Sequence, residues 1–251
     1  MAKTISVHSY RGGTGKSNTT ANLATTLASQ GNRVGLLDAD IQSPGIHTLF
    51  QLDVEQVPLT LNNYLWGNCD ITEATYDVTP AAVQPSGGKI FLVPSSIRAG
   101  DITKVLKEGY DIRLLKRGLK SLTKEYNLDY LLIDTHPGIN EETLLAIAIS
   151  NVLLLILRPD AQDFQGSAVV IDLARKLYVS KIFLVINRVL EALDAGAIQS
   201  QVESIYNAPV AGVFFNCDEM MQVASKDLFC LQYPNHALTR AFQAVAQQLT
   251  D

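Results

Sequence analysis

A glycine-rich segment with a single lysine, Tyr10–Ser17, constrains this chain more than any other feature. It reads Y-R-G-G-T-G-K-S, follows a β-branched run over Thr4–Ser9 and precedes a helix-like stretch that begins near Asn18. Glycines allow a tight backbone turn in which successive N–H groups converge on phosphate oxygens. The helix that follows adds the positive end of its dipole. The sequence therefore predicts a phosphate-binding loop between a strand and a helix.

The side chains at the end of this loop point to a nucleotide with a metal ion. Lys16 supplies a full charge for the β- and γ-phosphates, and Ser17 offers a hydroxyl for Mg²⁺. The usual pattern, G-x-x-x-x-G-K-[ST], requires glycine where this chain has Tyr10. The segment instead fits a second format, [K]-G-G-x-G-K-[ST], with Arg11 in the place of the first lysine. An ordinary strand-to-helix turn is the alternative interpretation of these glycines.

Carboxylates follow two further apolar strands. Asp38 and Asp40 come after Val34–Leu37, and Asp134 comes after Tyr130–Ile133. The carboxyl ends of parallel strands lie along one edge of a sheet, where ligands bind. We therefore expect the lysine loop and these acidic groups at one rim, an arrangement that suits a nucleotide with Mg²⁺. Capping of a following helix or loop is the alternative role for each aspartate.

With these motifs in place, the chain resembles the MinD/ParA family of deviant Walker A ATPases, in the SIMIBI class of P-loop proteins. Four later segments extend the resemblance nearly end to end: Ile90–Ser96, Leu157–Asp160, Val185–Arg188 and Gly212–Asn216. The resemblance implies one domain over residues 1–251. Its expected fold is a doubly wound, mostly parallel α/β sheet flanked by helices.

The resemblance also implies a role for each motif residue. Lys16 binds phosphate, Asp40 orients the attacking water, and Arg11 takes the position of a lysine that reaches the partner's phosphates in an ATP-dependent homodimer. Mg²⁺ is held by Ser17, by Asp134 through a coordinated water, and with support from Asp38. The nucleotide contacts that it implies are Gly12, Gly13, Thr14, Gly15, Lys16, Ser17, Asn18, Asn187, Arg188 and Phe214.

Two departures from the family pattern lie at this site. Arg11 keeps a permanent charge but has a planar fork instead of a compact ammonium. We expect dimerisation to be retained and the hydrolysis rate to differ from that of a lysine-bearing relative. Exposure to solvent or pairing with a local carboxylate is the alternative for Arg11. His136 stands where the family usually has proline, and both a contact with the nucleotide or a switch segment and a plain loop position are open.

Composition fits this interpretation. A chain of 251 residues that is 47% hydrophobic and 18% charged can bury the core of one α/β domain. No apolar run reaches the roughly eighteen residues of a membrane span. Cys69, Cys217 and Cys230 are odd in number and too widely spaced for a C-x-x-C pair, which favours reduced thiols. We predict a cytoplasmic protein.

Two segments bear on what surface the protein binds. The net charge of −5 argues against a broad nucleic-acid surface. Five basic residues nevertheless recur in one helical region, where they form either a patch for nonspecific DNA or a solvated helix face. Residues 237–249 have an apolar face but only one basic residue, Arg240, so we expect a helix packed on the core and not a membrane anchor. The basic residues of the first segment are Arg113, Lys116, Arg117, Lys120 and Lys124.

The function that these features favour is an ATP-switched dimer that positions or partitions an intracellular cargo, which is DNA, an organelle or a polar complex. A partner protein stimulates hydrolysis. One alternative is a regulatory ATP sensor with weak hydrolysis, which Arg11 keeps open. The other is a metal or iron–sulfur cluster delivery ATPase, which requires a cysteine pair shared by two subunits that this cysteine spacing does not offer.

Overall fold

The strands form one sheet in a computed structural model, which describes residues 2–250 apart from the side chain of Ile112. In the order β3-β4-β2-β5-β1-β6-β7-β8, every neighbouring pair is parallel except β3 with β4. The predicted doubly wound, mostly parallel sheet is therefore confirmed. The strands are β1 (Lys3–His8), β2 (Arg33–Ala39), β3 (Tyr76–Asp77), β4 (Lys89–Val93), β5 (Tyr130–Thr135), β6 (Val152–Leu157), β7 (Lys181–Val189) and β8 (Val210–Phe215).

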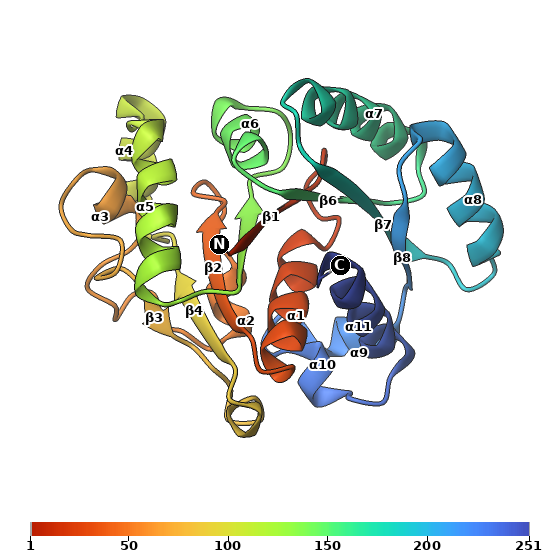
Figure 1. Cartoon of the computed structure of the whole chain (residues 1–251), viewed down its shortest axis with the longest axis horizontal. Coiled ribbons are helices and arrows are strands. Elements are labelled where there is room, and N and C mark those ends of the chain that lie inside the picture. Colours follow the sequence, from red (N-terminus) through yellow and green to blue (C-terminus); the bar gives the residue numbers. More distant parts are fainter. Residues whose placement is uncertain (1, 251) are drawn as a thin grey trace.

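Helices cover both faces of the sheet (Figure 1). Helices α4 (Ala99–Glu108), α5 (Ile112–Glu125), α6 (Glu141–Ala148), α7 (Ala161–Lys176) and α8 (Ala195–Tyr206) lie on one face. Helices α1 (Lys16–Ser29), α2 (Ile46–Leu49), α9 (Asp218–Val223), α10 (Phe229–Gln232) and α11 (Ala237–Thr250) lie on the other. Helix α3 (Leu61–Leu65) contacts α5, and a 3₁₀ turn spans Gln84–Ser86.

Burial on both faces explains the unbroken apolar strands. All six residues of β6 are buried. Because side chains alternate along a strand, Leu154 and Ile156 join the core under α1 and α11, while Leu153 and Leu155 join the core under α7 and α8. A run without polar alternation is what a strand in the middle of such a sheet requires.

The last helix belongs to the core. Phe242, Val245 and Leu249 of α11 are at most 1% exposed, and the helix packs on α1 and β8. The ring of Phe242 meets Phe214 edge-on at a centroid distance of 4.9 Å. The expected packing of this apolar face on the core is therefore observed. Across residues 2–250, no helix has the length and apolar character needed to cross a bilayer.

Candidate functional site

The predicted phosphate loop connects β1 to α1, and its glycines have conformations that other residues rarely adopt. Gly13 has φ of +73° and Gly15 has φ of +94°, both in the left-handed region. A Cβ at Gly15 would also lie 2.4 Å from Asn187 Nδ2. Both the backbone angle and the close approach of Asn187 therefore require glycine at position 15.

This loop presents backbone donors without acceptors. Within the part of the chain that the structure describes, the N–H groups of residues 12–17 donate no hydrogen bond. They lie at the N-terminus of α1, whose first turn has no acidic residue. Unpaired amides at the positive end of a helix dipole favour an anion.

Tyr10 occupies the position that the usual loop pattern gives to glycine, and α7 makes room for its ring. A Cβ at Gly166 would lie 1.8 Å from Tyr10 Cδ1. The tyrosine ring therefore packs directly on the backbone of α7. This contact connects the beginning of the loop to the helix that follows β6.

Lys16, Asp40 and Asp134 come together from three adjacent strands. Lys16 Nζ lies 3.1 Å from Asp134 Oδ1 and 3.9 Å from Asp40 Oδ2. The lysine is 7% exposed and Asp134 is 1% exposed, so this contact is shielded from water. The order β2-β5-β1 explains the proximity, because each strand ends at the same rim of the sheet.

Negative charge exceeds positive charge around Lys16. Asp38 is buried beside Asp134 and Asp40, and its carboxylate accepts the N–H groups of Asp40 and Gly45. Burial, followed by the charges of Asp134 and Asp40, raises the pKa of Asp38 well above its usual value. Asp134 Oδ2 is buried and has no hydrogen-bond partner in the described residues. These oxygen donors fit Mg²⁺, which prefers one or two carboxylates together with phosphate oxygens.

His136 contacts the predicted water-orienting residue. His136 Nδ1 lies 2.6 Å from Asp40 Oδ1, while Asp40 Oδ2 faces Lys16. The backbone carbonyl of His136 accepts a hydrogen bond from Thr143 Oγ1 of α6. His136 therefore belongs to the site, and the pairing of β2 with β5, which places Ala39 beside Thr135, brings it next to Asp40.

Arg11 lies against two carboxylates of the segment that begins α7. Its Nη1 is 3.3 Å from Asp160 Oδ1, and its Nε is 3.7 Å from Asp163 Oδ1. Arg158 Nε also contacts Asp163, at 3.0 Å. Arg11 therefore pairs with carboxylates that are not local, since Asp160 is 149 residues away in the sequence, and its side chain stays 39% exposed.

A cavity of about 390 Å³ beside the loop is lined by five of the residues expected to contact the nucleotide: Gly15, Asn18, Asn187, Arg188 and Phe214. Asn187 Nδ2 donates to the carbonyl of Thr14 at 2.7 Å, which connects β7 to the loop. Arg188 is exposed and has φ of +59°. Phe214 is 1% exposed, so its ring forms part of the core that closes this cavity.

Comparisons with known proteins agree with this geometry. The sequence profile of a family described as "AAA domain" matches residues 2–188. An uncharacterised ATP-binding protein of Methanocaldococcus jannaschii is 29% identical over 251 residues, which cover 99% of this chain and 88% of that protein. The sporulation initiation inhibitor protein Soj of Bacillus subtilis is 30% identical over 181 residues, covering 70% of this chain and 66% of Soj. The septum site-determining protein MinD of Pyrococcus horikoshii, solved with Mg-ADP, has the same fold, with a TM-score of 0.82, 22% identity and coverage of 99% and 96%.

Proposed function

Because the chain belongs to the MinD/ParA family of P-loop ATPases, we propose that it binds ATP with Mg²⁺ and hydrolyses it to ADP and phosphate in the cytoplasm. The strongest support is the position of Lys16, between two buried carboxylates and at the end of a loop whose amides have no acceptor. A triphosphate supplies the anion for these amides, and its metal ion supplies the cation for the carboxylates.

Each residue then has one task. The amides of residues 12–17 and the ammonium of Lys16 bind the β- and γ-phosphates, and Ser17, Asp38 and Asp134 hold the metal ion. Bound Mg²⁺ neutralises phosphate oxygens as negative charge develops on them. Asp40 orients the attacking water, and His136 fixes the direction of the Asp40 carboxylate through the 2.6 Å contact.

Replacement of the loop lysine tests the proposal. Lys16→Ala removes the ammonium that contacts both Asp40 and Asp134. We expect ATP to bind about 10- to 100-fold more weakly, since a hydrogen bond to a charged group contributes about 1.5–3 kcal/mol. The measurement is a titration with a fluorescent ATP analogue. Lys181→Ala, an exposed lysine at the start of β7, is the charge-matched control. Equal affinity in the Lys16→Ala and Lys181→Ala proteins would contradict the proposal.

We infer further that ATP holds two copies of the chain together. By resemblance, Arg11 takes the place of a lysine that reaches the partner's phosphates. To do so, Arg11 must leave Asp160 and Asp163, which compete for its charge in the single chain. The same competition favours the second candidate, a regulatory ATP sensor that hydrolyses slowly, because it holds Arg11 away from a partner.

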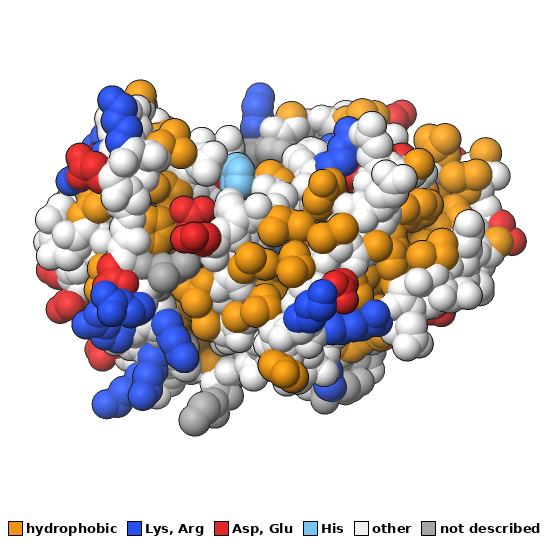
Figure 2. All heavy atoms as spheres, turned by 90° about the horizontal axis from the view of Figure 1, so that it is seen from above, with side chains coloured by type: hydrophobic (Ala, Val, Ile, Leu, Met, Phe, Trp, Pro, Cys, Tyr) orange, Lys and Arg blue, Asp and Glu red, His pale blue; other side chains and the backbone are white. Residues whose placement is uncertain are grey.

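Helix α5 supports nonspecific DNA as the surface that the dimer binds. Its apolar residues Leu115, Leu119 and Leu122 are buried, and basic side chains gather at the end of the molecule that carries α5 (Figure 2). Arg113 is paired with Asp111 at 2.8 Å. The remaining basic residues of the patch are exposed and form no ion pair with any residue in the described part of the chain: Lys116, Arg117, Lys120 and Lys124.

With such a surface, the protein would position or partition a cargo such as DNA, an organelle or a polar complex, and a partner protein would stimulate hydrolysis. Iron–sulfur or metal delivery is the alternative from a different class. It predicts visible absorption by a cluster in protein purified without oxygen. A colourless protein that hydrolyses ATP and binds DNA would contradict that alternative.

A further inference from the structure

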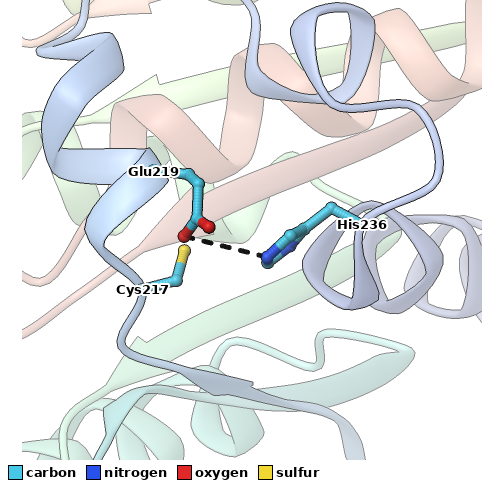
Figure 3. A group of neighbouring side chains, drawn as sticks. All are labelled: Cys217, Glu219 and His236. Atoms are coloured by element: carbon cyan, nitrogen blue, oxygen red, sulfur yellow. Dashed lines mark ion pairs between the residues drawn. The ribbon is translucent and has the colours of Figure 1, made fainter.

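A second cluster of metal-binding side chains lies outside the Lys16 site. Cys217 follows β8, Glu219 lies in the first turn of α9, and His236 comes just before α11. One ligand atom from each residue lies within 4.8 Å of the other two, and His236 Nε2 is 3.9 Å from Glu219 Oε2. Figure 3 shows the thiol, the carboxylate and the imidazole directed toward one another. Three separate segments of the chain thus converge at one point.

The surroundings of the cluster favour a cation. It lines a cavity of about 670 Å³ that also includes Glu191 and Asp218. Among the described residues that line this cavity there is no Lys or Arg. A positive ion would therefore relieve the repulsion between these acidic groups and stabilise the thiolate.

We propose that Cys217, Glu219 and His236 bind one divalent zinc-class cation. Sulfur, imidazole nitrogen and carboxylate oxygen together form a donor set that suits zinc more than Mg²⁺ or Ca²⁺. Ligand atoms at about 2.0–2.3 Å from zinc lie about 3.3–3.8 Å apart in a tetrahedron, so the observed separations need only a small closure. The open cavity leaves the fourth position to water.

Binding of the metal ion requires Cys217 to lose a proton and the proton of His236 to change position. The Cys217 thiol releases its proton to solvent as the sulfur–metal bond forms. His236 Nδ1 accepts the N–H of Leu238 at 3.1 Å, so the neutral ring carries its proton on Nε2, facing Glu219. Metal binding at Nε2 moves that proton to Nδ1 and ends the hydrogen bond to Leu238. The ion therefore loosens the first turn of α11, and we expect weaker affinity than at a site with four protein ligands.

The cluster lies next to the cavity in which the nucleotide is expected to bind. The cavity of the cluster and the cavity beside Asn187 share one wall, which contains Phe214, Asn216, Cys217 and Leu238. An ion at Cys217 would therefore contact this wall directly. The site is nevertheless separate from Lys16 and does not depend on the proposed ATPase activity.

Cobalt provides the test, because four-coordinate Co²⁺ with a thiolate ligand absorbs strongly. We expect the untagged, chelator-treated full chain to bind one Co²⁺ with a thiolate charge-transfer band, and Zn²⁺ to displace it. Cys217→Ser should abolish the band, and His236→Gln should weaken binding about 100-fold or more, since even loss of an indirect partner costs about 10–100-fold. Cys69→Ser is the matched control and should keep the band.

Absence of the band in the native protein, or its retention in Cys217→Ser, would overturn the proposal. Circular dichroism of each variant establishes that it is folded, and Glu219→Gln, on the exposed side of the cluster, provides a third ligand test. Lys16→Ala should bind ATP about 10- to 100-fold more weakly and keep the cobalt band. Failure of the metal proposal and failure of the ATPase proposal are therefore distinguishable.

Discussion

At the scale of single residues, the contact between His136 and Asp40 decides where a water could be held. One Asp40 oxygen is occupied by His136 Nδ1 at 2.6 Å, and the other faces Lys16 at 3.9 Å. Without the imidazole, this oxygen keeps only the N–H of Ser43, at 3.2 Å, and the carboxylate is held less firmly. A small error in the direction of a water-orienting group slows the chemical step more than it weakens ground-state binding.

We therefore expect His136→Ala to lower kcat about 10-fold, within the range for loss of a positioning contact, with little change in KM for ATP. His136→Asn places an amide near the former Nδ1 and should restore part of the rate. Steady-state release of phosphate measures both constants. A change in KM alone would show that His136 supports binding instead of the orientation of Asp40.

A second histidine contributes to stability in a way that depends on pH. His8 is buried, with Nδ1 2.7 Å from Thr135 Oγ1. Burial, followed by the positive charges of Lys16 and His136, lowers the pKa of His8 from 6.5 to about 3. Below pH 6.5, His8 binds a proton in the unfolded chain but stays neutral in the folded chain. The contribution of His8 to the free energy of unfolding, which is fully present above pH 6.5, is therefore lost as the pH falls toward 3.

His8→Asn tests this dependence. Between pH 7 and pH 5 we expect the unfolding free energy of the native protein to fall by about 2 kcal/mol more than that of the variant, since the full slope is about 1.4 kcal/mol per pH unit. Urea unfolding in the absence of nucleotide and Mg²⁺ gives both values. Parallel pH profiles of the two proteins would mean that His8 does not cause the loss of stability at low pH.

Contacts that follow from the order of the strands can be predicted from the sequence. Contacts that depend on how a helix packs on the sheet cannot. Lys16 comes after β1, and Asp134 lies near the end of β5, which is parallel to β1, so their proximity could be predicted. Asp40 and His136 also continue neighbouring strands, because β2 and β5 pair Ala39 with Thr135. The contact of Arg11 with Asp160 depends instead on how the start of α7 sits beside the loop. No periodicity or spacing encodes that position.

At the scale of elements, long regular segments were predictable and short ones were not. The apolar run of β6 and the amphipathic pattern of α5 indicate their type from sequence alone. Strand β3 has two residues, and α10 has four. Such elements form because tertiary neighbours hold them, as β4 pairs with β3, and not because local propensity favours them.

The basic face of α5 gives the prediction at this scale. Lys116, Lys120 and Lys124 recur once per turn, so replacing all three with alanine removes one stripe of charge. We expect the ATP-bound protein to bind nonspecific DNA more weakly and with a shallower salt dependence, by about 0.9 in log–log slope for each lost phosphate contact. Gel-shift titrations at several salt concentrations measure both quantities.

The control for this experiment carries the same change of charge elsewhere. Lys107→Ala, Lys181→Ala and Lys226→Ala combined remove three exposed lysines outside α5. The control should keep most of the affinity and the salt slope. An equal loss in both triple variants would indicate a response to net charge, and no binding by the native protein at low salt would remove DNA as the surface.

At the scale of the whole molecule, the proposed switch is a change of oligomeric state. We expect Asp40→Ala to bind ATP without hydrolysing it and to accumulate as a dimer, because removal of the water-orienting group leaves phosphate binding by Lys16 in place. Size-exclusion chromatography with light scattering, with and without ATP and Mg²⁺, measures the mass. The double variant with Arg11→Ala should remain a monomer, and so should Asp40→Ala without nucleotide.

If Asp40→Ala bound ATP and remained a monomer, two copies would not share the nucleotide. A dimer in the Arg11→Ala background would mean that other residues join the copies. The assignment of residues 1–251 to a single domain stays a prediction. It is consistent with one sheet that runs through β1 to β8.

The strand order has a consequence for the order in which a ribosome can complete this fold. Strand β1, which carries the lysine loop, has no sheet neighbour until β5 and β6 exist, and β5 begins at Tyr130. At about 5–20 residues per second, the first strand waits roughly 6 to 25 seconds for its partners. A nascent chain should therefore acquire nucleotide only after more than half of it has emerged, and until then the unpaired backbone of the first strand is exposed.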